Sequence, residues 1–233
     1  MRTVTAALVL LAGAAFADVA PPAQAPAKAD AGGPAAEPAP ATPKRTPEQL
    51  ANLRKLILDG LADSKTAARA ESAEILLVTW PDSAPILDEA LASKAAAVRI
   101  EAVQLLGREE LGDVRPRIRE RFSDTNPTVR MHAIRVARRL DWPEAEPDYI
   151  RRVTGDSEWI VCHEALRALE DRGTAACLAA VFAGWSHERD ADRRRRHHRV
   201  LVKVVGADHG DDEEAWKVAI EKALRPEFAH PAK

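Results

Sequence analysis

The sequence predicts an all-α protein, a right-handed α-solenoid of about five helical hairpins with a capping helix at its N-terminal end. The first observation behind this prediction is self-similarity, because one segment recurs four times at spacings of 30, 31 and 32 residues. The second is composition, since Ala, Leu, Arg and Glu, which favour helices, dominate between residues 65 and 224. The third is that this region lacks the alternation of apolar and polar residues that is typical of strands.

The copies of the recurring segment share three positions. Each opens with Asp or Ser, whose side chain can accept hydrogen bonds from free amides at a helix start. An Arg follows six residues later in three of the copies, and a small residue comes three residues after that position in all four. Apolar residues beyond the small one form a stripe on one helix face. The three positions hold Asp63, Arg69 and Ser72, then Ser93, Arg99 and Ala102, then Asp124, Arg130 and Ala133, then Asp156, Cys162 and Ala165.

Shorter helices are predicted between the copies. Residues 83–91 and 113–122 place Pro85 and Pro116 in the first turn, where a missing amide hydrogen costs least. Each copy, together with the Pro-initiated helix after it, is therefore expected to form one helical hairpin.

Both ends of the repeat region depart from this pattern, as the caps of a solenoid do. An amphipathic helix from Thr46 to about Ile57 or Leu58 is the expected N-terminal cap. At the other end, Ser186 is expected to cap a helix that runs to about Val205. This helix is a degenerate fifth repeat, and its alignment through Asp190 and Arg196 is ambiguous by one residue.

The Asp-x5-Arg-x-x-Ala pattern, intact at Asp124 and Arg130, and the Pro-initiated helices resemble the HEAT repeats, in particular their short bacterial, phycobilin-lyase-type variety. The resemblance covers roughly residues 46–224. It implies that the Asp and Arg positions form a ladder linking successive repeats, which Ser93 and Cys162 interrupt. The residues expected in this ladder are Asp63, Arg69, Arg99, Asp124, Arg130 and Asp156.

The first residues are typical of a secretion signal. Arg2 precedes an apolar run from Val4 to Phe16, which is too short to span a bilayer as a helix, so no stable membrane insertion is expected. We expect cleavage near Ala17 and export to the periplasm or the exterior. The predicted regions are the signal peptide at 1–17, a Pro/Ala-rich disordered linker at 18–45, the HEAT-repeat solenoid at 46–225 and a flexible tail at 226–233.

Two groups of arginines are candidate binding surfaces. The run from Arg193 to Arg199 could bind phosphate or an acidic protein surface, although the acids that follow from Asp208 could neutralise it. The other group lies on the Pro-initiated and equivalent helices, which the HEAT resemblance places on the concave, ligand-facing side, and nearby acids dilute its charge. The candidate binding residues are Arg115, Arg119, Arg151, Arg152, Arg193, Arg194 and Arg196.

The sequence contains no strong catalytic motif. It has no Ser-His-Asp order, phosphate-cradling glycine loop or paired Cys-x-x-Cys motif, so it predicts no enzyme and no cofactor. His163 and Glu164 resemble the pairs that hold iron in a HEAT-type hydroxylase family, but the doublet occurs in one repeat, so no metal is predicted. Cys162 and Cys177 should lie roughly 9 Å out of register along a hairpin, which predicts free, buried or partly buried thiols.

These observations favour a non-enzymatic scaffold that binds a protein or peptide partner on its solenoid surface. The formal net charge of −2 weighs against a nucleic-acid partner. The first alternative is a HEAT-like nucleic-acid-binding protein of the DNA-glycosylase type that uses the Arg-rich last repeats. The second is a lyase or chaperone-type helper of a cofactor-bearing protein, and it rests on the family resemblance alone.

Overall fold

The computed structural model describes residues 45–108 and 111–225. These residues form eleven α-helices and no β-strand, which confirms the predicted all-helical fold. The expected signal peptide, tail and linker, apart from Arg45 of the linker, lie outside the described residues.

Ten of the helices pair into five hairpins, each closed by a short turn. A single helix follows at the C-terminal end of the described chain. The hairpins are α2 (Pro47–Leu61) with α3 (Thr66–Val78), α4 (Ala84–Leu91) with α5 (Ala96–Leu105), α6 (Arg115–Arg121) with α7 (Pro127–Arg139), α8 (Glu146–Gly155) with α9 (Trp159–Arg172), and α10 (Leu178–His187) with α11 (Ala191–Val205), and the single helix is α12 (Glu213–Ala223).

The pairing is shifted by one helix from the expectation, because each copy pairs with the shorter helix before it and not with the one after it. The helix from Thr46 was expected to stand alone as a cap, but α2 packs closely against α3 and ends at Leu61, beyond the predicted end. The physical reason is the length of the connections, since α2 and α3 are joined by four residues and α3 and α4 by five, and the shortest turns favour antiparallel neighbours. The helix without a hairpin partner is α12, which contacts α10 and α11.

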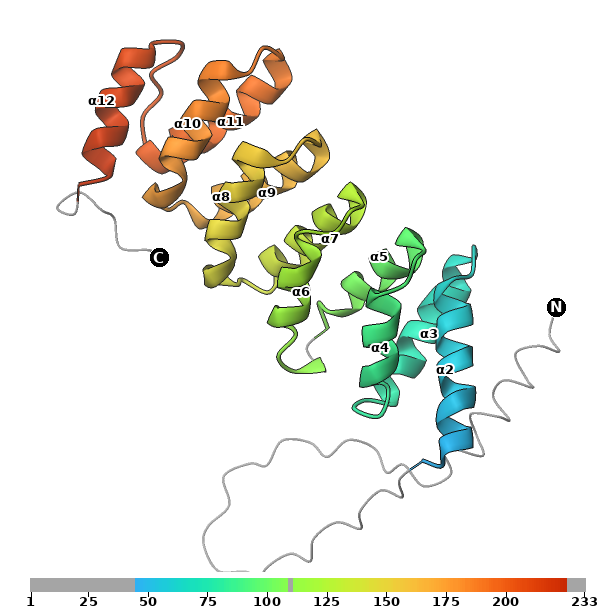
Figure 1. Cartoon of the computed structure of the whole chain (residues 1–233). Helices are drawn as coiled ribbons and strands as arrows, with labels where there is room; N and C mark the ends of the chain where they lie inside the picture. The colour runs from blue at the N-terminus through green and yellow to red at the C-terminus, as the bar shows by residue number, and fades with distance from the viewer. Residues whose placement is uncertain (1–44, 109–110, 226–233) are drawn as a thin grey trace, which may run out of the picture. The chain divides into compact units, whose positions relative to one another are not determined.

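The hairpins stack in chain order from α2 to α12, as Figure 1 shows. Helix α5 packs against α7, α7 against α9 and α9 against α11, so these four helices form one layer. Helix α3 continues this layer, since its Arg69 pairs with Glu101 of α5. We call this the second layer, because it contains the second helix of every hairpin. The first layer contains α2, α4, α6, α8, α10 and α12.

Apolar side chains fill the space between the two layers. The small residues of the repeat, Ala102, Ala133 and Ala165, are fully buried, and they allow neighbouring helices to approach closely. Larger buried side chains surround them, including Leu106 and Ile134. No apolar stripe of one hairpin could be covered by that hairpin alone, so the stack is what makes the core.

The fifth repeat is aligned differently from the sequence-based match. Helix α11 begins after its N-cap Asp190, whereas Ser186, which was expected to cap it, lies within α10. Counting from the helix start, Glu188 therefore occupies the Asp position, Arg194 the Arg position and His197 the small-residue position. The end of the helix at Val205 agrees with the prediction.

A glycine explains how a histidine fits where the other repeats have Ser or Ala. A Cβ atom on Gly184 of α10 would lie 2.4 Å from Nε2 of His197. The histidine ring fills the space that a side chain at 184 would need, and His197 is 3% exposed. In the last hairpin the large side chain therefore lies on α11 and the glycine on α10, so the two helices still pack closely.

Candidate functional site

The predicted ladder forms two complete steps. Arg99 donates two hydrogen bonds to the Asp124 carboxylate at 2.9 and 2.7 Å, and Arg130 donates two to Asp156 at 2.8 and 2.6 Å. The same guanidinium groups also donate to loop carbonyls of their own repeat, such as Ser93 O at 2.8 Å. Each Arg therefore ties its own turn to that of the next repeat.

The Asp and Ser positions stabilise the turns before the helices and not the helix N-caps themselves. The Asp63 carboxylate accepts from the Lys65 amide at 2.7 Å, and Asp124 accepts from the Asn126 amide at 2.8 Å. Helices α3 and α7 then begin one residue further on. The repeat signature thus predicts the turn and, through it, the helix start.

The ladder is interrupted where the sequence indicated. The next repeat has Ser93 at the Asp position, so Arg69 lacks its ladder partner. Its Nε forms an ion pair with Glu101 at 2.8 Å instead. At the second interruption Cys162 replaces the Arg, and its thiol lies 3.7 Å from the Val153 carbonyl oxygen.

Both cysteines are free and buried, as predicted. Burial, followed by the charges of Glu188 and Asp156, raises the pKa of Cys162 to about 12. Burial, followed by Glu146, raises the pKa of Cys177 to about 12. Neither thiol is set up as a nucleophile, because the thiolate is the reactive form.

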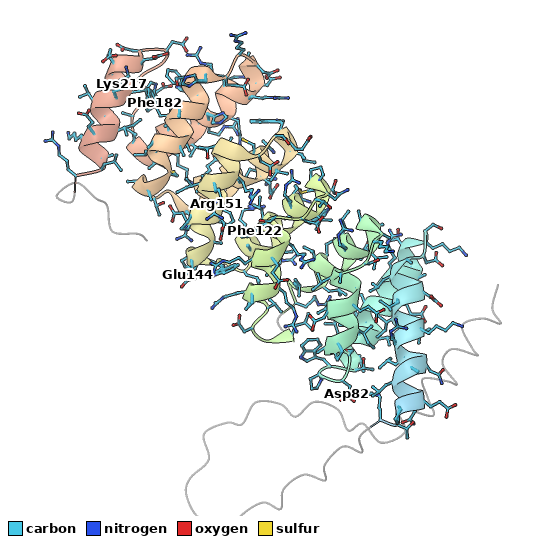
Figure 2. The ribbon with its side chains drawn as sticks, in the orientation of Figure 1. Asp82, Phe122, Glu144, Arg151, Phe182 and Lys217 are labelled. Atoms are coloured by element: carbon cyan, nitrogen blue, oxygen red, sulfur yellow. The ribbon has the colours of Figure 1, made fainter. Side chains whose placement is uncertain are left out.

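Three of the four arginines predicted on the first layer are engaged within the protein. Arg119 pairs with Asp148 at 3.3 Å and stacks over Trp142 at 4.7 Å. Arg151, labelled in Figure 2, pairs with the same carboxylate at 3.2 Å. Arg152 lies 3.6 Å from Asp156, and Arg115 is exposed without an ion pair in the described chain. The structure does not gather these four into one free cationic patch.

The three arginines predicted on α11 point to different neighbours. Arg193 lies over the Trp159 ring at 5.1 Å, while Arg194 lies over Trp185 at 4.5 Å and pairs with Asp211 at 3.1 Å. Arg196 pairs with Glu170 at 2.6 Å. Of the three, Arg196 also lines the pocket described below.

A different set of arginines forms a regular row on the second layer. Arg135, Arg167 and Arg199 are each the ninth residue of their helix, in α7, α9 and α11. Because these helices pack side by side, the three residues occupy equivalent places in successive repeats. All three are exposed. We call this set the arginine row.

A buried carboxylate anchors two members of the row. Glu164 is 2% exposed and lies 3.4 Å from Arg135 and 3.8 Å from Arg167. Arg138 also approaches it, at 3.4 Å. Arg138 also pairs with Asp171 at 2.7 Å, so three guanidinium groups face two carboxylates and this part of the surface keeps an excess of positive charge.

The third member of the row, Arg199, lines a pocket of about 470 Å³ between α9 and α11. Arg199 has no ion pair or side-chain hydrogen bond within residues 45–108 and 111–225, whereas Arg195 pairs with Asp192. We call this cavity the α9–α11 pocket. It is lined by Trp159, His163, Asp192, Arg195, Arg196 and Arg199.

Burial and nearby arginines together lower the pKa of two residues of the pocket. Burial lowers the pKa of His163, and the neighbouring Arg196, Arg167 and Arg199 lower it further against the opposing effect of Glu164. Burial also lowers the pKa of Arg196, with Glu170 opposing this effect and Arg199 and Arg167 adding to it. A bound anion would relieve this repulsion between like charges.

The comparisons with known proteins agree with the repeat architecture. Residues 83–169 match the family of HEAT repeats. This match and the stacked helices support a HEAT-repeat protein, and the described fold is an α-solenoid of helical hairpins. A search of curated proteins found no match to the sequence.

The described residues contain no group of three or more His, Cys, Asp or Glu side chains that could hold a metal ion. None of the helices in the described chain combines the length and the apolar character that crossing a membrane requires.

The arginine row was missed by the sequence-based search, although a signal for it exists. Its members stand five residues after the ladder positions 130, 162 and 194. Comparing that position across the aligned repeats would have identified Arg135 and Arg167. The sequence instead drew attention to the run from 193 to 199, because its charged residues are adjacent. Arg199 could be added only once the alignment of the fifth repeat was known.

Proposed function

We propose that this protein is an exported, non-enzymatic scaffold that binds a protein partner through the second layer of its last three hairpins. HEAT repeats are generally protein-interaction scaffolds, and the match covers part of this surface. The observation that carries the proposal is the arginine row, because three exposed cations occupy equivalent positions in successive repeats and Arg199 pairs with no acid in the described chain. Helices α7, α9 and α11 hold the row rigid, so little order is lost on binding.

The test compares two triple variants in a crosslinking pull-down from the envelope or secreted fraction. The first replaces the row (R135Q, R167Q and R199Q), and the second makes the same charge change on the first layer (R115Q, R151Q and K217Q). Recovery of the partner should fall about tenfold or more with the row variant, since each charge-assisted hydrogen bond contributes roughly 1.5 to 3 kcal/mol. The first-layer variant should retain the partner.

The opposite result would transfer the binding surface to the first layer, where Arg115 and Arg151 were predicted. Recovery of no protein with any form of the chain under gentle conditions would argue against the scaffold function itself. Circular dichroism of both variants guards against the trivial case in which loss of the Glu164 contacts unfolds α9.

Export is the second part of the proposal and is supported by the sequence of residues 1–17. The mature protein should begin at Asp18, which mass measurement of the intact chain after cell fractionation would show. A chain that keeps residues 1–17 and remains in the cytoplasmic fraction would contradict export.

A further inference from the structure

We propose that the α9–α11 pocket binds an acidic side chain of an extended segment of the partner, and that the arginine row binds further acidic residues of the same segment. This inference rests on the scaffold function proposed above and specifies the chemistry of the partner. Arg199 belongs to both features, since it ends the row and lines the pocket.

The residues of the pocket suit a carboxylate. Arg199 is free to donate two hydrogen bonds to a planar carboxylate, a geometry that the guanidinium group matches. Arg196 is held in place by Glu170, at 2.6 Å, with its side chain 11% exposed. The Trp159 ring supplies an apolar wall for the methylene groups of the incoming side chain.

The spacing of the row favours an extended segment. Packed helices lie about 8 to 10 Å apart, so equivalent residues on α7, α9 and α11 repeat at about that distance. A segment in the extended polyproline II conformation advances about 3.1 Å per residue with about three residues per turn, so every third side chain lies on the same face and reaches the next arginine. The row therefore selects acidic residues at intervals of three.

The residues at the equivalent position in the first repeats argue against a long polyanion, such as a nucleic acid, as the ligand. In the first repeats the ninth residues of α3 and α5 are Glu74 and Gln104 in place of arginine. The side chain of Glu74 is 61% exposed, and its carboxylate pairs with Arg108 at 3.5 Å. A uniform chain of phosphates that continued along the layer would meet this carboxylate, whereas a short acidic peptide ends before it.

The probe is a capped ten-residue peptide with Glu at every third position and Ser and Gly between. Its controls are the same peptide with Gln for Glu and a single-stranded DNA of ten thymidines. Calorimetry at low salt should show binding of the Glu peptide alone, and R199E should weaken that binding about tenfold or more. The matched charge reversal R151E on α8 should change it by less than a factor of two.

Proton NMR of His163 gives a second readout, with its signal assigned through H163Q. The peptide carboxylate should raise the pKa of His163 in the complex, because it opposes the three neighbouring arginines. Equal binding of the Gln peptide, binding that R199E leaves unchanged, or tighter binding of the DNA would each overturn the inference. If the pull-down loses its partner with the row variant while the Glu peptide does not bind, the scaffold function stands and the acidic-segment inference fails.

Discussion

At the level of single residues, the ladder shows how one side chain can serve two repeats. Arg99 and Arg130 each satisfy carbonyl groups of their own turn while holding the Asp of the next turn. Their side chains are 11% exposed, and the partner carboxylates of Asp124 and Asp156 are 5% and 2% exposed. Screening by solvent is therefore much weaker than at a surface ion pair.

The ladder predicts that stability depends on acid pH. Burial on its own would raise the pKa of Asp124, but hydrogen bonds from Arg99 and the Asn126 amide hold it below its ordinary value. A carboxyl group whose pKa is depressed by folding stabilises the fold above the unfolded pKa of about 3.9, and that contribution is lost as the pH falls through the lower folded value. The midpoint of urea unfolding should thus fall as the pH is lowered below about 4.

The variant D124N isolates this contribution. It should lower the free energy of unfolding at pH 7 by about 2 kcal/mol and should flatten the pH dependence below pH 4. The matched control is D63N, because Asp63 holds the same repeat position and its carboxylate accepts from the Lys65 amide, but that carboxylate pairs with no arginine in the described chain. If D124N unfolds with the wild-type pH dependence, protonation of Asp124 does not contribute to the pH dependence of the free energy of unfolding.

At the level of helices, the packing of the His197 ring against Gly184 leads to a testable prediction. A methyl group at 184 would lie 2.4 Å from His197 Nε2, so G184A should destabilise the protein by about 1 to 3 kcal/mol, the usual cost of overpacking. The change G155A is the matched control, since a Cβ there meets nothing within 4 Å in α8 and Ala favours the helix by up to about 1 kcal/mol.

The double variant G184A/H197A tests the mechanism. Removing the imidazole should relieve the clash, so the two substitutions together should cost less than the sum of their separate effects. Thermal unfolding of the four proteins measures this coupling. Additive losses would mean that Gly184 is required for another reason than the space taken by His197.

The same pair explains why the fifth repeat was hard to place from sequence. The helix starts of α3, α5, α7 and α9 follow from the local spacing of Asp or Ser, Arg and a small residue. In α11 the small position holds His197, which is acceptable because of Gly184 on another helix. A compensation between two helices is invisible to a comparison of aligned single segments.

The candidate site was predictable to a smaller extent for a similar reason. The sequence identified Arg196 and the charged run around it, but it could not show that Arg119 and Arg151 share Asp148 or that Arg194 pairs with Asp211. Which cations remain free depends on contacts between elements. Arg199 stands out only when those contacts are known.

At the level of the whole stack, each hairpin contacts its neighbours and few residues beyond them. The free energy of unfolding in such a structure is approximately a sum over repeats and the interfaces between them. The C-terminal end depends on Trp216 of α12, which is fully buried and lies 6.2 Å from Trp185 of α10 between ring centroids. Damage at this end should therefore remain local.

The substitution W216A measures how local it is. Loss of the buried indole should cost about 3 to 5 kcal/mol at that interface. Hydrogen exchange should then accelerate strongly in α10, α11 and α12, where the neighbours Trp185 and His198 lose their contact. The amides of α3 and α5 should keep their wild-type rates, because no interface in that part of the stack involves α12. Equal acceleration in all helices would show that the chain unfolds as a single cooperative unit, and the arginine row would then be only as stable as the weakest end of the stack.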